Sequence, residues 1–314
     1  MLTKGFLRSC FTIAISKWSI RLVSMFLCIG NVIVVANASS PQEQTRGLHV
    51  KKIEENRPAA SAPADPKQPR TYRSATSNVS ASDAHKSGTG EAVIGVTLWR
   101  LRQARSTDNQ DARILEHQPS RNQEWAAERI EADAKLKEGE RVRLSIESPS
   151  TGFLYVIDRE EYSNGSVGEP FVIFPTARTR GGNNSVVGGK LIEFPGQGDN
   201  PPYFTLSRSR ADHVGELLII IASPRQIPEL QSLSDAAPVP ADKIASWERD
   251  WGGRTERLEL EGGAGLPYTG VEKTAGGDGS RMLTQGDPLP QTILRVNAKP
   301  GEPTLVKLRL RIAD

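Results

Sequence analysis

Three acidic residues, Asp158, Glu160 and Glu161, follow one another closely and are the sequence's first candidates for acid–base chemistry. Two carboxyl groups held close together can cleave a glycosidic bond, and the same oxygens could bind calcium. Arg159 lies among them and would tend to neutralise their charge, so a solvated turn is the competing interpretation. If the three residues act together, we expect cleavage of a glycan or an ester.

A second candidate is a set of basic residues in and beyond a loop rich in glycine and asparagine. Arginine forks suit carboxylate and phosphate groups, so an anionic polymer of the cell envelope is a possible ligand. A charged, solvated loop would have the same composition. The candidate ligand-contact residues are Arg178, Arg180, Lys190, Arg208 and Arg210.

Histidine and cysteine give little support for metal or covalent chemistry. The two cysteines, Cys10 and Cys28, lie at the N-terminus, and the four histidines are scattered without metal-binding spacing. His213 follows Asp212, but adjacent strand residues point to opposite faces, and no nucleophile-elbow motif occurs. We therefore expect no catalytic residues, no cofactor and no metal site.

The overall composition narrows the expected partners. A net charge of +3 on 314 residues is too small to indicate a nucleic-acid surface by itself. Several aromatic residues lie on predicted strands and could stack on sugars, although about half of such positions should face the core. The expected partner is a protein or a glycan, not a nucleic acid.

The N-terminus has the pattern of an export signal. Residues 1–21 carry four basic residues and no acid, residues 22–36 are apolar, and small residues lead up to Ala38. This pattern resembles a secretory signal peptide over residues 1–38. The apolar run is shorter than the roughly 20 residues that span a bilayer, and an uncleaved membrane anchor is the alternative. We expect the mature protein in the periplasm or outside the cell.

Residues 39–90 are rich in serine, alanine, proline and charge, with a single aromatic residue, Tyr72. Such a segment cannot bury enough apolar surface to offset the entropy lost on ordering. It is therefore expected to be a disordered linker, serving either as a tether or as an unselected spacer. A β-rich domain should follow over residues 91–314.

Short apolar or alternating segments, separated by glycine and proline, fill this domain. This spacing is typical of an antiparallel β-sandwich or barrel. Residues 215–222 form a continuous apolar run, which predicts a strand buried on both faces, and residues 125–133 favour extended structure. Residues 139–148 alternate cleanly, which predicts a strand with one wet face, formed by Arg141, Arg143, Ser145 and Glu147.

One short helix is expected over residues 241–251, with Asp242 as its cap and glycines at its end. Ile244, Trp247 and Trp251 fall on one helical face, and this stripe is more typical of core packing than of a ligand platform. The glycine-rich segment 262–280 is expected to be a mobile loop.

Five short motifs in this domain resemble, in their order, the bacterial family of domains of unknown function numbered 4384, over about residues 125–228. The resemblance implies a β-sandwich-like module of exported or envelope-linked proteins, and it implies no known activity or catalytic residue. Thr176 stands where the family usually has asparagine. The motifs begin at Glu138 (EGERVRLSIES), Gly152 (GFLYVID), Val172 (VIFPT), Phe204 (FTL) and Glu216 (ELLIIIASP).

These observations predict a non-catalytic interaction module of the bacterial envelope or periplasm. The alternative is a hydrolase that uses Asp158, Glu160 or Glu161. A purely structural appendage without a ligand of its own is a third reading.

Overall fold

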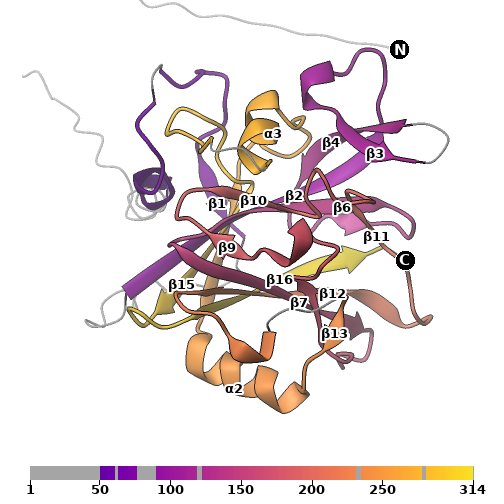
Figure 1. Cartoon of the computed structure of the whole chain (residues 1–314), viewed down its shortest axis with the longest axis vertical. Helices are drawn as coiled ribbons and strands as arrows, with labels where there is room; N and C mark the ends of the chain where they lie inside the picture. Colours follow the sequence, from indigo (N-terminus) through magenta and orange to yellow (C-terminus); the bar gives the residue numbers. More distant parts are fainter. Residues whose placement is uncertain are drawn as a thin grey trace, which may run out of the picture. The chain divides into compact units, whose positions relative to one another are not determined.

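The computed structural model describes residues 50–60, 63–75, 90–118, 122–230, 235–277 and 281–313. The predicted signal peptide lies outside these residues. Within them the chain is mainly β, as predicted, and its strands form two sheets (Figure 1). All pairings between named strands are antiparallel except that of β5 (Lys135–Leu136) with β16 (Thr304–Ile312).

The larger sheet is centred on β2, which pairs with β6 along one edge and with β15 and then β4 along the other. β14 and β1 extend it beyond β15, β3 extends it beyond β4, and β10 and β11 pair with β6. Its strands are β1 (Tyr72–Ser74), β2 (Gly90–Gln103), β3 (Ile114–His117), β4 (Asn122–Ile130), β6 (Arg141–Glu147), β10 (Leu191–Phe194), β11 (Phe204–Thr205), β14 (Thr255–Leu260) and β15 (Thr292–Ala298).

The smaller sheet is centred on β12, which lies between β7 and β16 in long, nearly continuous ladders. β8 and β13 extend it beyond β7, and β9 also pairs with β7. Besides β5 and β16, its strands are β7 (Gly152–Tyr162), β8 (Phe171–Phe174), β9 (Ser185–Val186), β12 (His213–Ser223) and β13 (Ala237–Pro238).

The main core lies between the two sheets. Alternate residues of each strand point into it because side chains in a strand alternate between faces, and the residues of this core cluster are apolar. The prediction of a β-sandwich is therefore confirmed. Representative core residues are Val96, Leu98, Leu144, Ile146, Val156, Ile220 and Leu308.

The outer face of the smaller sheet is covered by helix α2 (Ala241–Trp251), which has the predicted bounds. Ile244 and Trp247 pack on Ile219 and Ile221 of β12, so this strand is buried on both faces, as expected. The predicted cap is wrong, because Pro240 occupies the N-cap position and Asp242 lies in the first turn. Figure 1 shows α2 on the opposite side of the strand layers from α3 (Gly270–Gly276).

The outer face of the larger sheet is also covered, which corrects the prediction of a wet face on β6. Arg143 is fully buried and Ser145 and Glu147 are nearly so. The alternation itself is as predicted, but segments from both ends of the sequence lie over the polar side. Glu147 pairs with Arg57 of one such segment, whereas Arg143 pairs with Glu193 of β10. Residues 50–60 supply part of this cover, and residues 267–291 supply the rest.

The linker prediction is accordingly wrong for residues 50–60 and 63–75. Residues 50–55 are helical, Ile53 is 2% exposed, and Tyr72 belongs to β1 and is 1% exposed. These two side chains join Val93, Leu258, Leu260, Leu289 and Ile293 in one apolar cluster on the larger sheet. A few well-placed apolar residues therefore anchor a segment whose average composition is polar.

The glycine-rich segment, predicted as a loop, has a helix in its described part, residues 262–277. It contains α3, and Thr269 and Glu272 cap this helix reciprocally, since each side chain accepts a hydrogen bond from the other's backbone N–H. Strands β3 and β15 are among those that the sequence did not predict. Apolar neighbours of the sheet stabilise all three elements.

Candidate functional site

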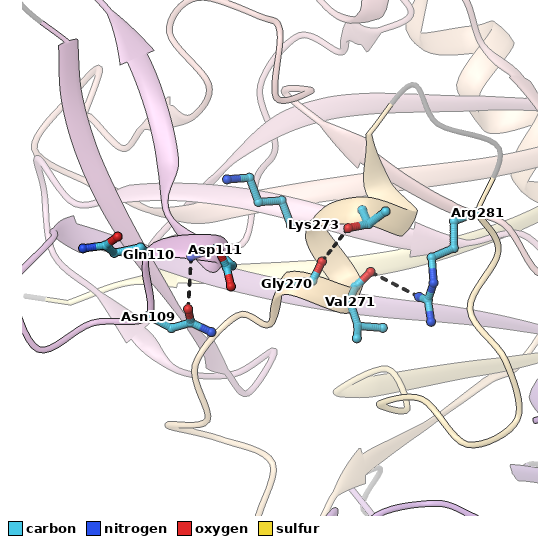
Figure 2. A pocket seen from close by; sticks show the side chains of 8 residues that line it. Asn109, Gln110, Asp111, Gly270, Val271, Lys273 and Arg281 are labelled. Atoms are coloured by element: carbon cyan, nitrogen blue, oxygen red, sulfur yellow. Dashed lines mark hydrogen bonds between the residues drawn. The ribbon is translucent and has the colours of Figure 1, made fainter. Parts of the chain in front are cut away.

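An open depression lies between the 3-10 helix η2 (Gln110–Ala112) and helix α3, with a volume of about 770 Å³. Figure 2 shows Asn109, Gln110 and Asp111 on one side of it, opposite α3 and Arg281. The volume falls within the range of ligand-binding clefts. The residues that line it are Asn109, Gln110, Asp111, Gly270, Val271, Lys273, Thr274 and Arg281.

Local hydrogen bonds hold both walls of this η2–α3 depression. The Asn109 side chain accepts from the Asp111 backbone N–H at 3.0 Å and caps η2. On the other wall, Lys273 Nζ donates to the carbonyl of Arg113 at 2.6 Å and ties α3 to the chain just after η2. Arg281 donates to the carbonyl of Val271 at 3.4 Å. The two walls are therefore linked directly to each other.

Helix α3 is also attached to the sheet beneath it. Glu272, which caps the helix, forms a buried ion pair with Arg129 of β4, whose other terminal nitrogen donates to the carbonyl of Leu289 at 2.6 Å. Gly276 lies so close to Glu193 of β10 that an added Cβ would be 2.2 Å from its carboxyl carbon. The position of α3, and hence of the depression, depends on these contacts.

The lining is polar and carries both signs of charge. Lys273 and Arg281 are basic, Asp111 is acidic, and the amides of Asn109 and Gln110 offer donors and acceptors. Val271 is the one large aliphatic side chain among the eight lining residues, and none of the eight is aromatic. A second depression of about 330 Å³ lies beside the first and shares Asn109 with it. The surface is therefore suited to an extended polar partner.

A buried ionic cluster lies under the covering segments. Glu193 of β10 accepts hydrogen bonds from Arg143 at 2.9 Å, from Gln197 at 2.9 Å and from the Tyr268 hydroxyl. Burial, together with the neighbouring Glu193 carboxylate, raises the pKa of Tyr268. Arg143 also donates to the carbonyl of Pro195, while its Nε and Nη1 atoms have no hydrogen-bond partner. Sequence patterns gave no sign of this cluster, because its members are distant along the chain.

The three acidic residues predicted as a catalytic cluster do not point the same way. Asp158 and Glu160 lie on the side of β7 that faces the other sheet, whereas Glu161 lies on the opposite side and pairs with Arg309 of β16 at 2.8 Å. Glu160 accepts from the Tyr162 and Ser209 hydroxyls. The alternation of side chains along β7 therefore separates Glu161 from the other two.

The partner of Asp158 is Glu216 of β12, which sequence analysis did not single out. Asp158 Oδ1 and Glu216 Oε2 are buried without a hydrogen-bond partner, and the negative charge of Asp158 disfavours ionisation of Glu216. Burial, and then the nearby carboxylates, raise the pKa of Asp158 to about 7 and that of Glu216 to about 9. The sequence signal that could have identified Glu216 is an acidic residue near the start of an otherwise apolar strand.

His213 lies beside this pair but does not form a catalytic triad. Its Nε2 atom is 2.9 Å from the carbonyl oxygen of Gly215 and 3.3 Å from Glu216 Oε1. Its Nδ1 atom accepts from the backbone N–H of Ser209, whose hydroxyl donates to Glu160 instead. The hydroxyl is thus not hydrogen-bonded to the imidazole as an activated nucleophile would be.

The five predicted ligand-contact residues occupy separate surroundings. Arg178 pairs with Asp235 at 3.1 Å, and Arg210 pairs with Asp212 while lying over the Tyr162 ring. The backbone N–H of Arg180, which begins η3 (Arg180–Gly182), donates to the Asp199 carboxylate. Arg208 donates to the carbonyl of Ala313, and Lys190 is half-buried just before β10. None of the five lines the η2–α3 depression.

Among the described residues, no three or more histidine, cysteine, aspartate or glutamate side chains are grouped so that they could hold a metal ion. In the same part of the chain, no helix combines the length and apolar character needed to cross a membrane. No family model, no curated protein and no solved structure matches this sequence. The resemblance to family 4384 therefore stays a prediction.

Proposed function

We propose that this protein is an interaction module that acts in the bacterial envelope or periplasm and holds a partner in the η2–α3 depression. The open, polar and mixed-charge lining of that depression carries the proposal. Its walls are fixed to each other and to the sandwich, so little ordering is needed on binding. Because no aromatic side chain lines it, a polypeptide is favoured over a glycan that would stack on a ring.

The proposal is tested by blocking the depression. Thr274 is exposed on α3 and lines the depression, so Thr274→Trp should fill part of it while leaving the fold intact. Ala245 is also exposed, on α2 on the other side of the molecule, and Ala245→Trp is the matched control. Cross-linking to envelope extracts should give a complex that Thr274→Trp loses and Ala245→Trp keeps. Equal cross-linking by both variants would rule out this surface.

Hydrolysis of a glycan or an ester is the second candidate, and the raised pKa values of Asp158 and Glu216 favour it. A carboxyl group that keeps its proton near neutral pH can serve as a general acid. Turnover of envelope polysaccharides or esters, abolished by Glu216→Gln or Asp158→Asn, would establish this activity. Neither depression described above includes these two residues, which is why we place binding first.

A further inference from the structure

Arg57 lies in a closed site on the outer face of the larger sheet. Its side chain is 3% exposed or less, although it belongs to a segment of polar composition. Its Nε atom donates to Glu147 Oε2 at 3.0 Å, and its Nη2 atom donates to the other oxygen of the same carboxylate. This two-point contact is the fork geometry that a guanidinium makes with a carboxylate.

Three backbone carbonyls complete the site. Arg57 Nη2 also donates to the carbonyl of Pro288 at 2.9 Å, and Nη1 donates to those of Thr284 and Asp287 at 3.2 and 3.3 Å. All five N–H groups of the guanidinium therefore have acceptors. A lysine ammonium has three N–H groups and could not reproduce this planar set.

The carbonyls are held in place without help from Arg57. The Asp287 carboxylate accepts from the backbone N–H of Thr284 at 2.7 Å, from its hydroxyl at 3.0 Å and from Arg281 at 3.2 Å. These bonds close a turn whose carbonyls face the guanidinium. Glu147 is fixed by its position in β6, next to β2. The site is thus built from the sandwich and this turn.

The domain also recognises the backbone on either side of Arg57. The N–H of Gln285 donates to the carbonyl of Pro58 at 3.0 Å, and its side-chain amide donates to the carbonyl of Glu54 at 3.2 Å. Ile53 inserts into the apolar cluster beside the site. Residues 50–60 therefore lie on the domain as a bound peptide does, with one arginine anchor and one apolar anchor.

We propose that Glu147 and the turn at residues 284–288 form a guanidinium-binding site, and that residues 50–60 are its built-in ligand. The chemical class that it accepts is an arginine side chain or another planar guanidinium group. The proposal does not depend on a partner in the η2–α3 depression. It implies that a free guanidinium compound can take the place of the Arg57 head group when that group is removed.

The test is chemical rescue of the full chain carrying Arg57→Ala. We expect a lower melting temperature and a saturable recovery of at least half of the loss on adding millimolar ethylguanidinium, far below denaturing concentrations. Methylammonium at equal ionic strength should give no recovery. Arg73→Ala, which breaks an exposed ion pair with Glu131, is the matched control and should not respond to ethylguanidinium. Recovery that is absent, or equal in the control, would overturn the proposal.

A second variant keeps the test decisive if Arg57→Ala does not fold alone. The same compounds are then added during refolding, and the yield of native protein should rise with ethylguanidinium and not with methylammonium. Adding Glu147→Gln to Arg57→Ala removes the carboxylate that binds two of the five N–H groups, so the response should disappear. A response that survives this double substitution would show that the compound acts elsewhere.

Discussion

Single side chains in this protein owe their chemistry to burial more than to sequence neighbours. Asp158 and Glu216 are 58 positions apart in the sequence, yet the pairing of β7 with β12 brings them together. Glu160 and His213 are the other titratable groups beside them. Burial disfavours two negative charges at this point, so the folded protein keeps a proton that the unfolded chain would release.

This retained proton predicts how stability depends on pH. The ordinary pKa values of the two groups are 3.8 and 4.5, and both values are raised in the folded state. The stabilising contribution of the proton is therefore complete below about pH 4 and is lost as pH rises toward about pH 9. Urea unfolding across this range should show a free energy of unfolding that falls with rising pH.

Glu216→Gln is the variant that checks the origin of this dependence. Glutamine can donate a hydrogen bond to Asp158 but does not titrate, so the decline with pH should become shallower. Glu161→Gln, on the opposite side of β7, should leave the decline unchanged. An unaltered slope in Glu216→Gln would assign the pH dependence to other groups, of which Glu259, with its pKa raised to about 7, is the first.

Among the elements, helix α3 depends most on its contacts with the sheet beneath it. The helix has seven residues, too few to be stable alone in water. Its capping glutamate pairs with Arg129, and Gly276 allows its last turn to approach the buried Glu193. The wall of the proposed binding surface therefore depends on the Glu272–Arg129 ion pair and on the absence of a side chain at Gly276.

Gly276→Ala should destabilise the protein by about 1–3 kcal/mol, because the new Cβ would overlap a carboxyl group that is fixed by three donors. The neighbouring Gly277→Ala is a close control, since its Cβ would meet nothing nearer than 3.5 Å. Thermal and urea unfolding of the two variants measure the difference. Equal stabilities would mean that Glu193 can move aside, and that the cluster is less rigid than its bonds indicate.

For the molecule as a whole, local patterns predict the sandwich but not what covers it. Alternation along β6 and the apolar run of β12 depend only on neighbouring residues, and both patterns correctly predicted strands at these positions. The polar side of β6 was predicted to be wet because the partners of its charges, Arg57 and Glu193, lie far away in sequence. The η2–α3 depression went unrecognised for the same reason, although the T-x-x-E spacing of Thr269 and Glu272 was a visible capping signal.

The covering segment yields a prediction for the intact chain. β1 pairs with β14, and Ile53, Arg57 and Tyr72 are buried, so residues 50–75 should remain bound after the chain is cut between residues 75 and 90. A protease site inserted there, followed by cleavage and size-exclusion chromatography, should give two fragments that elute together. Glu147→Gln should weaken their association. Separation of the wild-type fragments without denaturant would contradict the prediction.

Scission and release would then be separate events in this protein. A proteolytic nick after Ala75 would leave the N-terminal fragment attached through a β-ladder and a salt bridge instead of a peptide bond. Any cargo or anchor carried on that fragment would stay with the sandwich until a competing ligand displaced Arg57 from its site. Detachment would become reversible and dependent on concentration, which a covalent linkage does not permit.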